Sequence, residues 1–118
     1  MTEAEMKSRT KAFALRVVRL TEALPKSRMG DVLARQLLRA ATSVGANYRS
    51  ACRGRSKAEF IAKLGIVEEE ADESAYWMEL IVESGLMTPR RIEPLLSECN
   101  ELVAIVVATI RSTKGGRH

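Results

Sequence analysis

Arginine side chains recur at regular spacing in the first half of the chain, and the groups that arginine binds best are phosphates and carboxylates. Arg35 and Arg39 are one helical turn apart, as are Arg49 and Arg53, and two heptads separate the two pairs. In a helix this spacing places all four on nearly one face. A stripe of this kind can follow a phosphate backbone and bind it by charge, largely without regard to sequence. The predicted nucleic-acid-binding residues are Arg35, Arg49, Arg53, Arg55 and Lys57.

An acidic run over residues 68–73 offers the arginines a different partner, within one subunit or between subunits. If the second and third helices turn back near Arg55, facing residues have numbers that sum to about 110. Arg39 then faces Glu70, and Gln36 faces Glu73 or Ser74. Carboxylate pairs can also perform acid–base chemistry or bind hard cations. On a long helix, however, they more often form a solvated face with salt bridges. The arginines of the basic stripe can therefore either bind phosphates or pair with these carboxylates, and both interpretations stay open.

The residue types that most enzymes need are missing or poorly placed. The single histidine is His118, at the end of the sequence, so no histidine-based metal motif or nucleophile–histidine pair can form. There is no glycine-rich phosphate loop. Cys52 and Cys99 are expected to be reduced thiols, although arginines near Cys52 could lower its pKa. We therefore predict a protein without enzymatic activity, metal or cofactor.

The overall composition is that of one helical domain. The chain has 118 residues, is rich in Ala, Leu, Glu and Arg, and is only 4% aromatic. Net charge is +8 over residues 1–56 and −4 over residues 57–118. Lys7, Lys11, Arg16 and Arg19 add to the basic half. With no signal-like start and no apolar run near the roughly 20 residues of a membrane span, we expect a cytoplasmic protein without membrane contact.

Hydrophobic periodicity divides the chain into four expected helices. They cover about residues 3–24, 31–53, 57–84 and 88–113. Thr2 with Glu5 and Ser56 with Glu59 are capping boxes, which mark the starts of the first and third. Asp31 is the expected N-cap of the second.

Two further features bear on how the helices pack. Pro94 either kinks the fourth helix or marks its true start. The small-residue segment 40–47 includes Gly45, which costs about 1 kcal/mol inside a helix and is tolerated where a neighbour approaches closely. Short connections predict an all-α, antiparallel up-down four-helix bundle over residues 1–113, with 114–118 as a disordered tail.

The fourth helix carries more apolar residues than one core needs, because they occupy most of its circumference. These residues are Leu102, Val103, Ile105, Val106, Val107 and Ile110. In a bundle this small, a second covering surface has to come from another subunit. We therefore predict a homo-oligomer.

Two stretches, residues 36–48 (QLLRAATSVGANY) and 60–80 (FIAKLGIVEEEADESAYWMEL), resemble a known signature. In this order, the patterns Q-x-x-R-A-x-x-S-V-x-A-N and E-x-x-E-x-x-Y-W look like the four-helix-bundle family of 23S ribosomal RNA intervening-sequence proteins. The accessory variability protein of diversity-generating retroelements belongs to the same family. The resemblance covers about residues 13–110.

The resemblance implies an up-down bundle assembled as a ring, typically a homopentamer, with no catalytic residues. It also implies that the retroelement branch binds nucleic acid and a partner reverse transcriptase through a basic surface. The signature positions, interpreted as fold and interface residues, are Gln36, Arg39, Ser43, Asn47, Glu70, Glu73 and Trp77. The basic stripe is not part of that signature, so nucleic-acid binding does not transfer with it.

The leading functional hypothesis is a non-enzymatic ring oligomer that binds RNA, DNA or a ribonucleoprotein through the basic stripe. The alternative is a protein–protein scaffold whose basic face docks an acidic partner, including the acidic helix of another copy. A small-molecule site within the bundle or ring channel is a third, weaker possibility, because no constellation of polar residues marks one.

Overall fold

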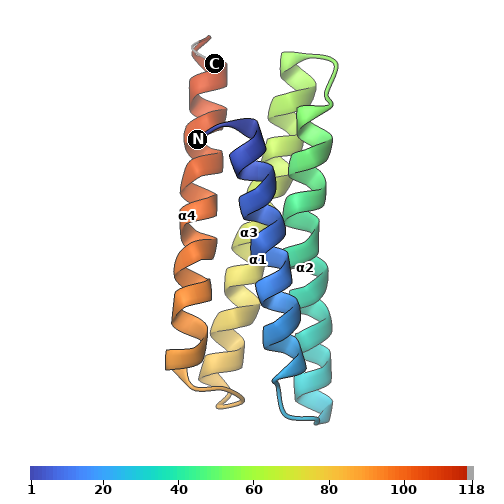
Figure 1. Cartoon of the computed structure of the whole chain (residues 1–118), viewed down its shortest axis with the longest axis vertical. Helices are drawn as coiled ribbons and strands as arrows, with labels where there is room; N and C mark the ends of the chain where they lie inside the picture. The colour runs from blue at the N-terminus through green and yellow to red at the C-terminus, as the bar shows by residue number, and fades with distance from the viewer. Residues whose placement is uncertain (117–118) are drawn as a thin grey trace.

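The computed structural model describes residues 1–116, which form four helices that alternate in direction along a bundle of 47 × 21 × 19 Å (Figure 1). The helices are α1 (Glu3–Glu22), α2 (Arg28–Cys52), α3 (Lys57–Glu83) and α4 (Pro89–Lys114). Each packs against two neighbours in cyclic order, and the seam between α1 and α4 is the loosest. The predicted all-α bundle is confirmed for this subunit.

Side-chain caps fix where α1 and α3 begin. The Thr2 hydroxyl accepts a hydrogen bond from the Glu5 amide at 3.1 Å, and the Glu5 carboxylate accepts one from the Thr2 amide, so this capping box is complete. Ser56 likewise accepts from the Glu59 amide at 3.1 Å. The Glu59 carboxylate, however, accepts from the Arg55 amide and not from that of Ser56. The second box is therefore only half formed, although it starts the helix as predicted.

The start of α2 differs from the prediction, because the N-cap is Ser27 and not Asp31. The Ser27 hydroxyl accepts from the Gly30 amide at 3.0 Å, and the helix begins at Arg28. Asp31 lies within the first turn, where a carboxylate stabilises the positive end of the helix. Gly30 is a buried helical residue whose missing side chain makes room for the chain entering the helix: a Cβ there would lie 2.4 Å from the Pro25 carbonyl oxygen.

Replacing Gly30 by alanine is expected to lower the free energy of unfolding by about 1–3 kcal/mol, because the added methyl overlaps backbone that cannot move away cheaply. Gly65 provides the matched control. Nothing lies within 4 Å of its virtual Cβ, so Gly65→Ala is expected to raise stability by about 0.5–1 kcal/mol through helix propensity. Urea unfolding followed by circular dichroism measures both, and shifts of the same sign would contradict the packing argument.

α4 is continuous across its internal proline. It begins at Pro89, so Pro94 lies inside the helix and does not mark its start. The helix also extends to Lys114, one residue beyond the expected boundary, and Gly115 caps it. Of the predicted disordered tail, 117–118 lie outside the described residues.

The apolar surface of α4 is only partly buried within the subunit, so its covering by another subunit stays a prediction. Leu102 and Val106 are fully buried, and Val103, Ile105 and Ile110 pack, partly buried, against the core. α4 contacts both α1 and α3, which together cover more of its circumference than a single neighbour could. Large apolar side chains that stay exposed lie elsewhere in the described chain. They are Met1, Leu15, Met29, Val32, Ile66 and Tyr76.

Candidate nucleic-acid interface

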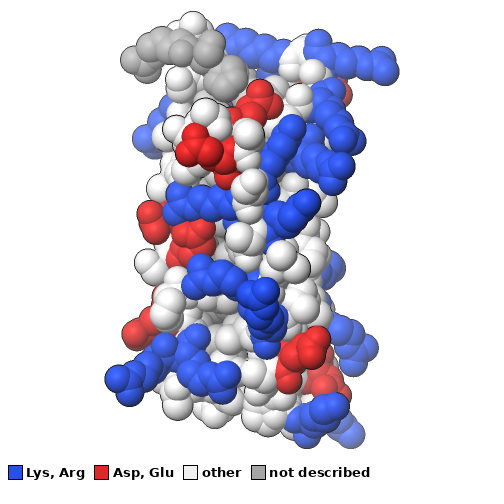
Figure 2. Space-filling view, viewed as in Figure 1, with Lys and Arg blue, Asp and Glu red and all other residues white. Residues whose placement is uncertain are grey.

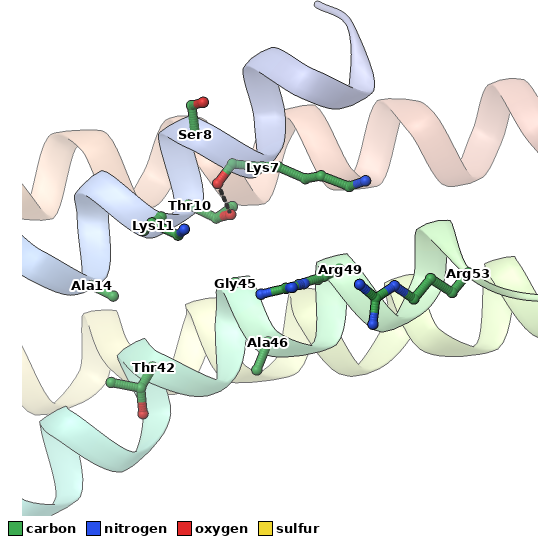
Figure 3. Close-up of a pocket in the computed structure, with 10 residues that line it drawn as sticks. All are labelled: Lys7, Ser8, Thr10, Lys11, Ala14, Thr42, Gly45, Ala46, Arg49 and Arg53. Carbon is green, nitrogen blue, oxygen red and sulfur yellow. Dashed lines mark hydrogen bonds between the residues drawn. The ribbon is translucent and has the colours of Figure 1, made fainter.

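A groove between α1 and α2 gathers part of the basic stripe (Figure 3). It has a volume of about 490 Å³, within the range of about 300–1,000 Å³ that small-ligand sites occupy. Lys7 and Lys11 line it from α1, and Arg49 and Arg53 line it from α2. In Figure 3 the charged ends of these side chains lie in the space between the two helices. Figure 2 shows Lys and Arg side chains gathered over the same part of the molecule.

Helical spacing places the four cations. Lys7 and Lys11 are four residues apart on α1, and Arg49 and Arg53 are four apart on α2, so each pair projects from one helix face. Gly45 brings the two helices together, since a Cβ there would lie 3.3 Å from the Thr10 hydroxyl oxygen. The close approach predicted for this glycine is thus confirmed, and it makes the floor of the groove narrow.

The groove is electrostatically uncompensated. No acidic side chain lines it. The ion pairs found within residues 1–116 all use Arg9 or Arg39, so Lys7, Lys11 and both groove arginines remain outside them. A concave surface that concentrates one sign of charge raises the local concentration of oppositely charged ligands.

The structure brings together only two of the five predicted binding residues. Arg49 and Arg53 line the groove. Arg35 is exposed on α2, fourteen residues or about 21 Å of helix before Arg49. Arg55 is exposed in the turn after α2, and Lys57 lines a separate cavity near Glu3 at that end of the bundle. Sequence reasoning noted the charge of Lys7 and Lys11 but did not assign them to the site, because nothing in the pattern says which face of α1 meets α2.

The signature residues lie instead along the seam between α2 and α3. The predicted Arg39–Glu70 contact is confirmed, with Nη1 and Oε1 3.5 Å apart, and Arg39 also pairs with Glu73. Glu73 in turn accepts a hydrogen bond from the Trp77 indole at 3.2 Å. The Arg39 side chain is 50% exposed, so this cluster sits at the surface of the seam. Its arginine is neutralised, which removes Arg39 from the surface available to phosphates.

The other signature side chains are also part of α2 or its surface. Ser43 donates a hydrogen bond to the Arg39 carbonyl at 2.7 Å, and Asn47 donates to the Ser43 carbonyl at 2.9 Å. These bonds stay within one helix. Gln36 is half-buried one turn before Arg39. We interpret this group as structural.

Glu70 and Glu98 each pair with an arginine, but their pKa values are shifted in opposite directions. Burial raises the pKa of Glu70 above its ordinary value, and the Arg39 charge only partly opposes this. The hydrogen bonds from Arg9 lower the pKa of Glu98. Arg9 binds Glu98 in a bidentate fork, with Nε–Oε2 2.7 Å and Nη2–Oε1 2.8 Å. This fork ties α1 to α4 across the loosest seam of the bundle.

Glu98→Gln is expected to cost about 1 kcal/mol of stability near neutral pH, the upper end for a partly exposed pair. Because the folded-state pKa of Glu98 is lowered, its contribution is present above the unfolded-state pKa of about 4.3 and is lost as pH falls through the folded value. The gap between wild type and variant should therefore close in acid. Unfolding free energies between neutral and acidic pH test this, with Glu93→Gln, an exposed α4 carboxylate outside the ion pairs described, as control. A gap that persists unchanged in acid would contradict the assignment.

Neither the cysteines nor the aromatic residues add chemistry to the groove. Burial raises the pKa of Cys52, the opposite of the direction considered from its neighbouring arginines, and burial raises the pKa of Cys99 to about 12. Both thiols are therefore protonated at neutral pH. Tyr48 is buried. The exposed Tyr76 packs edge-to-face against Trp77 on α3, away from the groove.

Within residues 1–116 no cluster of three or more potential ligands could hold a metal ion. None of the described helices is long and apolar enough to cross a membrane.

These features define an antiparallel four-helix bundle with an interhelical salt-bridge seam and a separate cationic groove. Residues 2–108 match the model of the 23S rRNA-intervening sequence protein family. The chain belongs to this family, as the resemblance of its signature stretches indicated. No match was found among curated proteins.

A solved structure supports the same assignment. It is the crystal structure, at 1.70 Å resolution, of a protein with unknown function from the S23 ribosomal protein family of Bacteroides thetaiotaomicron. The two chains share 33% sequence identity and superpose with a TM-score of 0.87, over 94% of this chain and 99% of the other. The fold and the family are therefore established together.

Proposed function

We propose that this protein is a non-enzymatic accessory factor that binds nucleic acid through the α1–α2 groove and the basic residues around it. The observation that carries the proposal is the set of four cations that line one groove with no acidic neighbour. Cations left outside ion pairs are free to displace the counterions of a phosphate backbone. Arg35, Arg55 and Lys57, all exposed, extend the basic surface beyond the groove.

RNA is the first nucleic acid to test, because the family description names 23S rRNA. We further propose that the protein acts in the cytoplasm and that a reverse transcriptase or another protein is its partner in a ribonucleoprotein. The basic first half of the chain supports contact with an RNA-bearing partner.

The functional unit in this proposal is a ring homo-oligomer, with five subunits as the expected number. Half-exposed apolar side chains on the outside of the bundle, including Leu15, Met29 and Val32, support burial against other copies. Light scattering at micromolar concentration measures the mass directly. A stable monomer would rule out the ring and leave the groove proposal standing.

Fluorescence anisotropy with labelled single-stranded RNA and duplex DNA tests the binding itself. We expect saturable binding at low salt, with the logarithm of the binding constant falling linearly with the logarithm of salt concentration. Absence of binding to either probe at low salt would refute the proposal.

The second candidate function is a protein scaffold, favoured by the exposed carboxylates of α3. Glu69, Asp72 and Glu83 face solvent and could neutralise the groove of another copy or of a partner. A pull-down that still recovers a specific protein after nuclease treatment, from a chain that binds no nucleic acid, would favour this candidate.

A further inference from the structure

We infer that the α1–α2 groove seats the sugar–phosphate backbone of a single nucleic-acid strand, with the bases facing solvent. This inference rests on the proposed function and specifies the ligand's form and orientation. Its experiment distinguishes a wrong position of the strand from the absence of nucleic-acid binding.

The walls of the groove present cations on both sides of a narrow track. Lys7 and Lys11 lie on one wall, and Arg49 and Arg53 lie on the other. Four residues of helix rise about 6 Å, so the charges on each wall recur at a spacing comparable with that of successive phosphates in an extended strand. A strand lying along the groove therefore meets a cation from each wall as it advances. Arginine can bind a phosphate through two parallel hydrogen bonds, and lysine acts as a point charge.

The floor of the groove is made of small side chains. Thr10, Ala14 and Gly45 are its least exposed small residues, and a Cβ at Gly45 would lie 3.3 Å from the Thr10 hydroxyl oxygen, whereas Thr42 and Ala46 are exposed on the α2 wall. Adjacent packed helices have axes about 8–10 Å apart, so the track between them has the width of one chain and not of a duplex. A duplex would rest on the rims, while a single strand can descend to the floor and be flanked by all four cations.

The groove has nothing with which to recognise bases. Single-strand binders commonly stack bases on aromatic side chains, and no aromatic residue lines this groove. The Thr42 hydroxyl already donates to the Leu38 carbonyl at 2.7 Å. The Thr10 hydroxyl is similarly engaged with the Met6 carbonyl at 3.0 Å. The groove can therefore recognise only the phosphates, and its affinity for a single strand should not depend on base composition.

Ala46→Leu tests the proposed strand position because it adds bulk to the α2 wall of the groove without changing any charge. Ala46 is exposed within α2, so leucine is tolerated by the helix. The matched control is Ala62→Leu at an exposed position of α3 outside the groove. We expect Ala46→Leu to weaken binding of a single-stranded oligonucleotide by about tenfold or more, one decade being about 1.4 kcal/mol, and Ala62→Leu to leave it unchanged. Thr42→Leu, also exposed on the α2 wall, repeats the test if Ala46→Leu melts early by circular dichroism.

Three probes of the wild-type protein complete the experiment. Oligo(dT) and oligo(dA) should bind equally, a duplex of the same length should bind more weakly, and inorganic tripolyphosphate should displace the single strand. Unchanged binding by both α2-wall variants, a tenfold preference between the homopolymers, or tighter binding of the duplex would each contradict the proposed strand position while leaving nucleic-acid binding intact. No binding of any probe would overturn the proposed function as well.

Discussion

Arg49→Glu combined with Arg53→Glu is expected to reduce nucleic-acid affinity by about 100-fold or more. Both residues line the groove from α2, and neither takes part in the ion pairs described for residues 1–116. Each reversal removes an attractive charge and adds a repulsive one. A loss of about 1.4 kcal/mol for each reversal is about tenfold in affinity, so the two together give about two decades.

The salt dependence of binding gives an independent readout of the same change. Each phosphate contact to a single strand contributes about −0.7 to the log–log slope, so losing two should make the slope shallower by about 1.4. Lys26→Glu with Arg28→Glu is the control, since it changes the net charge equally at exposed positions near the start of α2. If the control weakened binding as much as the groove variant, long-range charge alone would explain the affinity. Unchanged binding by the groove variant would place the site elsewhere.

Phe13→Ala is expected to lower the free energy of unfolding by about 3–5 kcal/mol, the usual cost of emptying a buried aromatic site. Phe13 is 0% exposed and belongs to the single core cluster of the bundle. A domain of this size has a total stability of about 5–15 kcal/mol, so the variant should be close to unfolding at physiological temperature.

Leu15→Ala on the same helix separates core burial from helix propensity. Leu15 is 50% exposed, and its replacement should change the stability of the isolated subunit by about 0.5 kcal/mol or less. Urea unfolding, followed through Trp77 fluorescence at one fixed protein concentration, measures both variants. Comparable losses of unfolding free energy for Phe13→Ala and Leu15→Ala in a monomer would contradict the core placement of Phe13. In an oligomer, the same result would show that Leu15 is buried between subunits. A measurement of the molecular mass distinguishes the two cases.

Much of the fold could be predicted because its determinants are local. Thr2 and Ser56 start helices by hydrogen bonds to amides three residues away, and such pairs are visible in sequence. The start of α2 differs from the prediction because Ser27, and not Asp31, caps the helix, which makes Gly30 a helical residue. Its actual role depends on the Pro25 carbonyl, whose position is set by how the chain turns between α1 and α2.

The candidate site could be predicted only in part. Residue arithmetic correctly paired Arg39 with Glu70, since antiparallel helices joined by a short turn keep a simple register. The same arithmetic could not relate α1 to α2, so Lys7 and Lys11 were left out of the site. Arg55 and Lys57 were included by proximity in sequence, although Lys57 lines a different cavity. The sequence shows how many apolar residues α4 carries, but only packing shows which of them α1 and α3 bury.

By itself, the sequence determined four helices, their approximate ends, the split of charge between the halves and the family. These properties follow from residue type and short-range spacing, which act through hydrogen bonds and side-chain contacts within one or two helical turns. Tertiary structure alone decided which of the other arginines remain available and which lysines lie beside them. Arg39 meets Glu70 and Glu73 across the α2–α3 seam, whereas Arg49 and Arg53 face two lysines across the α1–α2 groove. That difference depends on the rotation of each helix about its own axis, which the packing of the whole core sets.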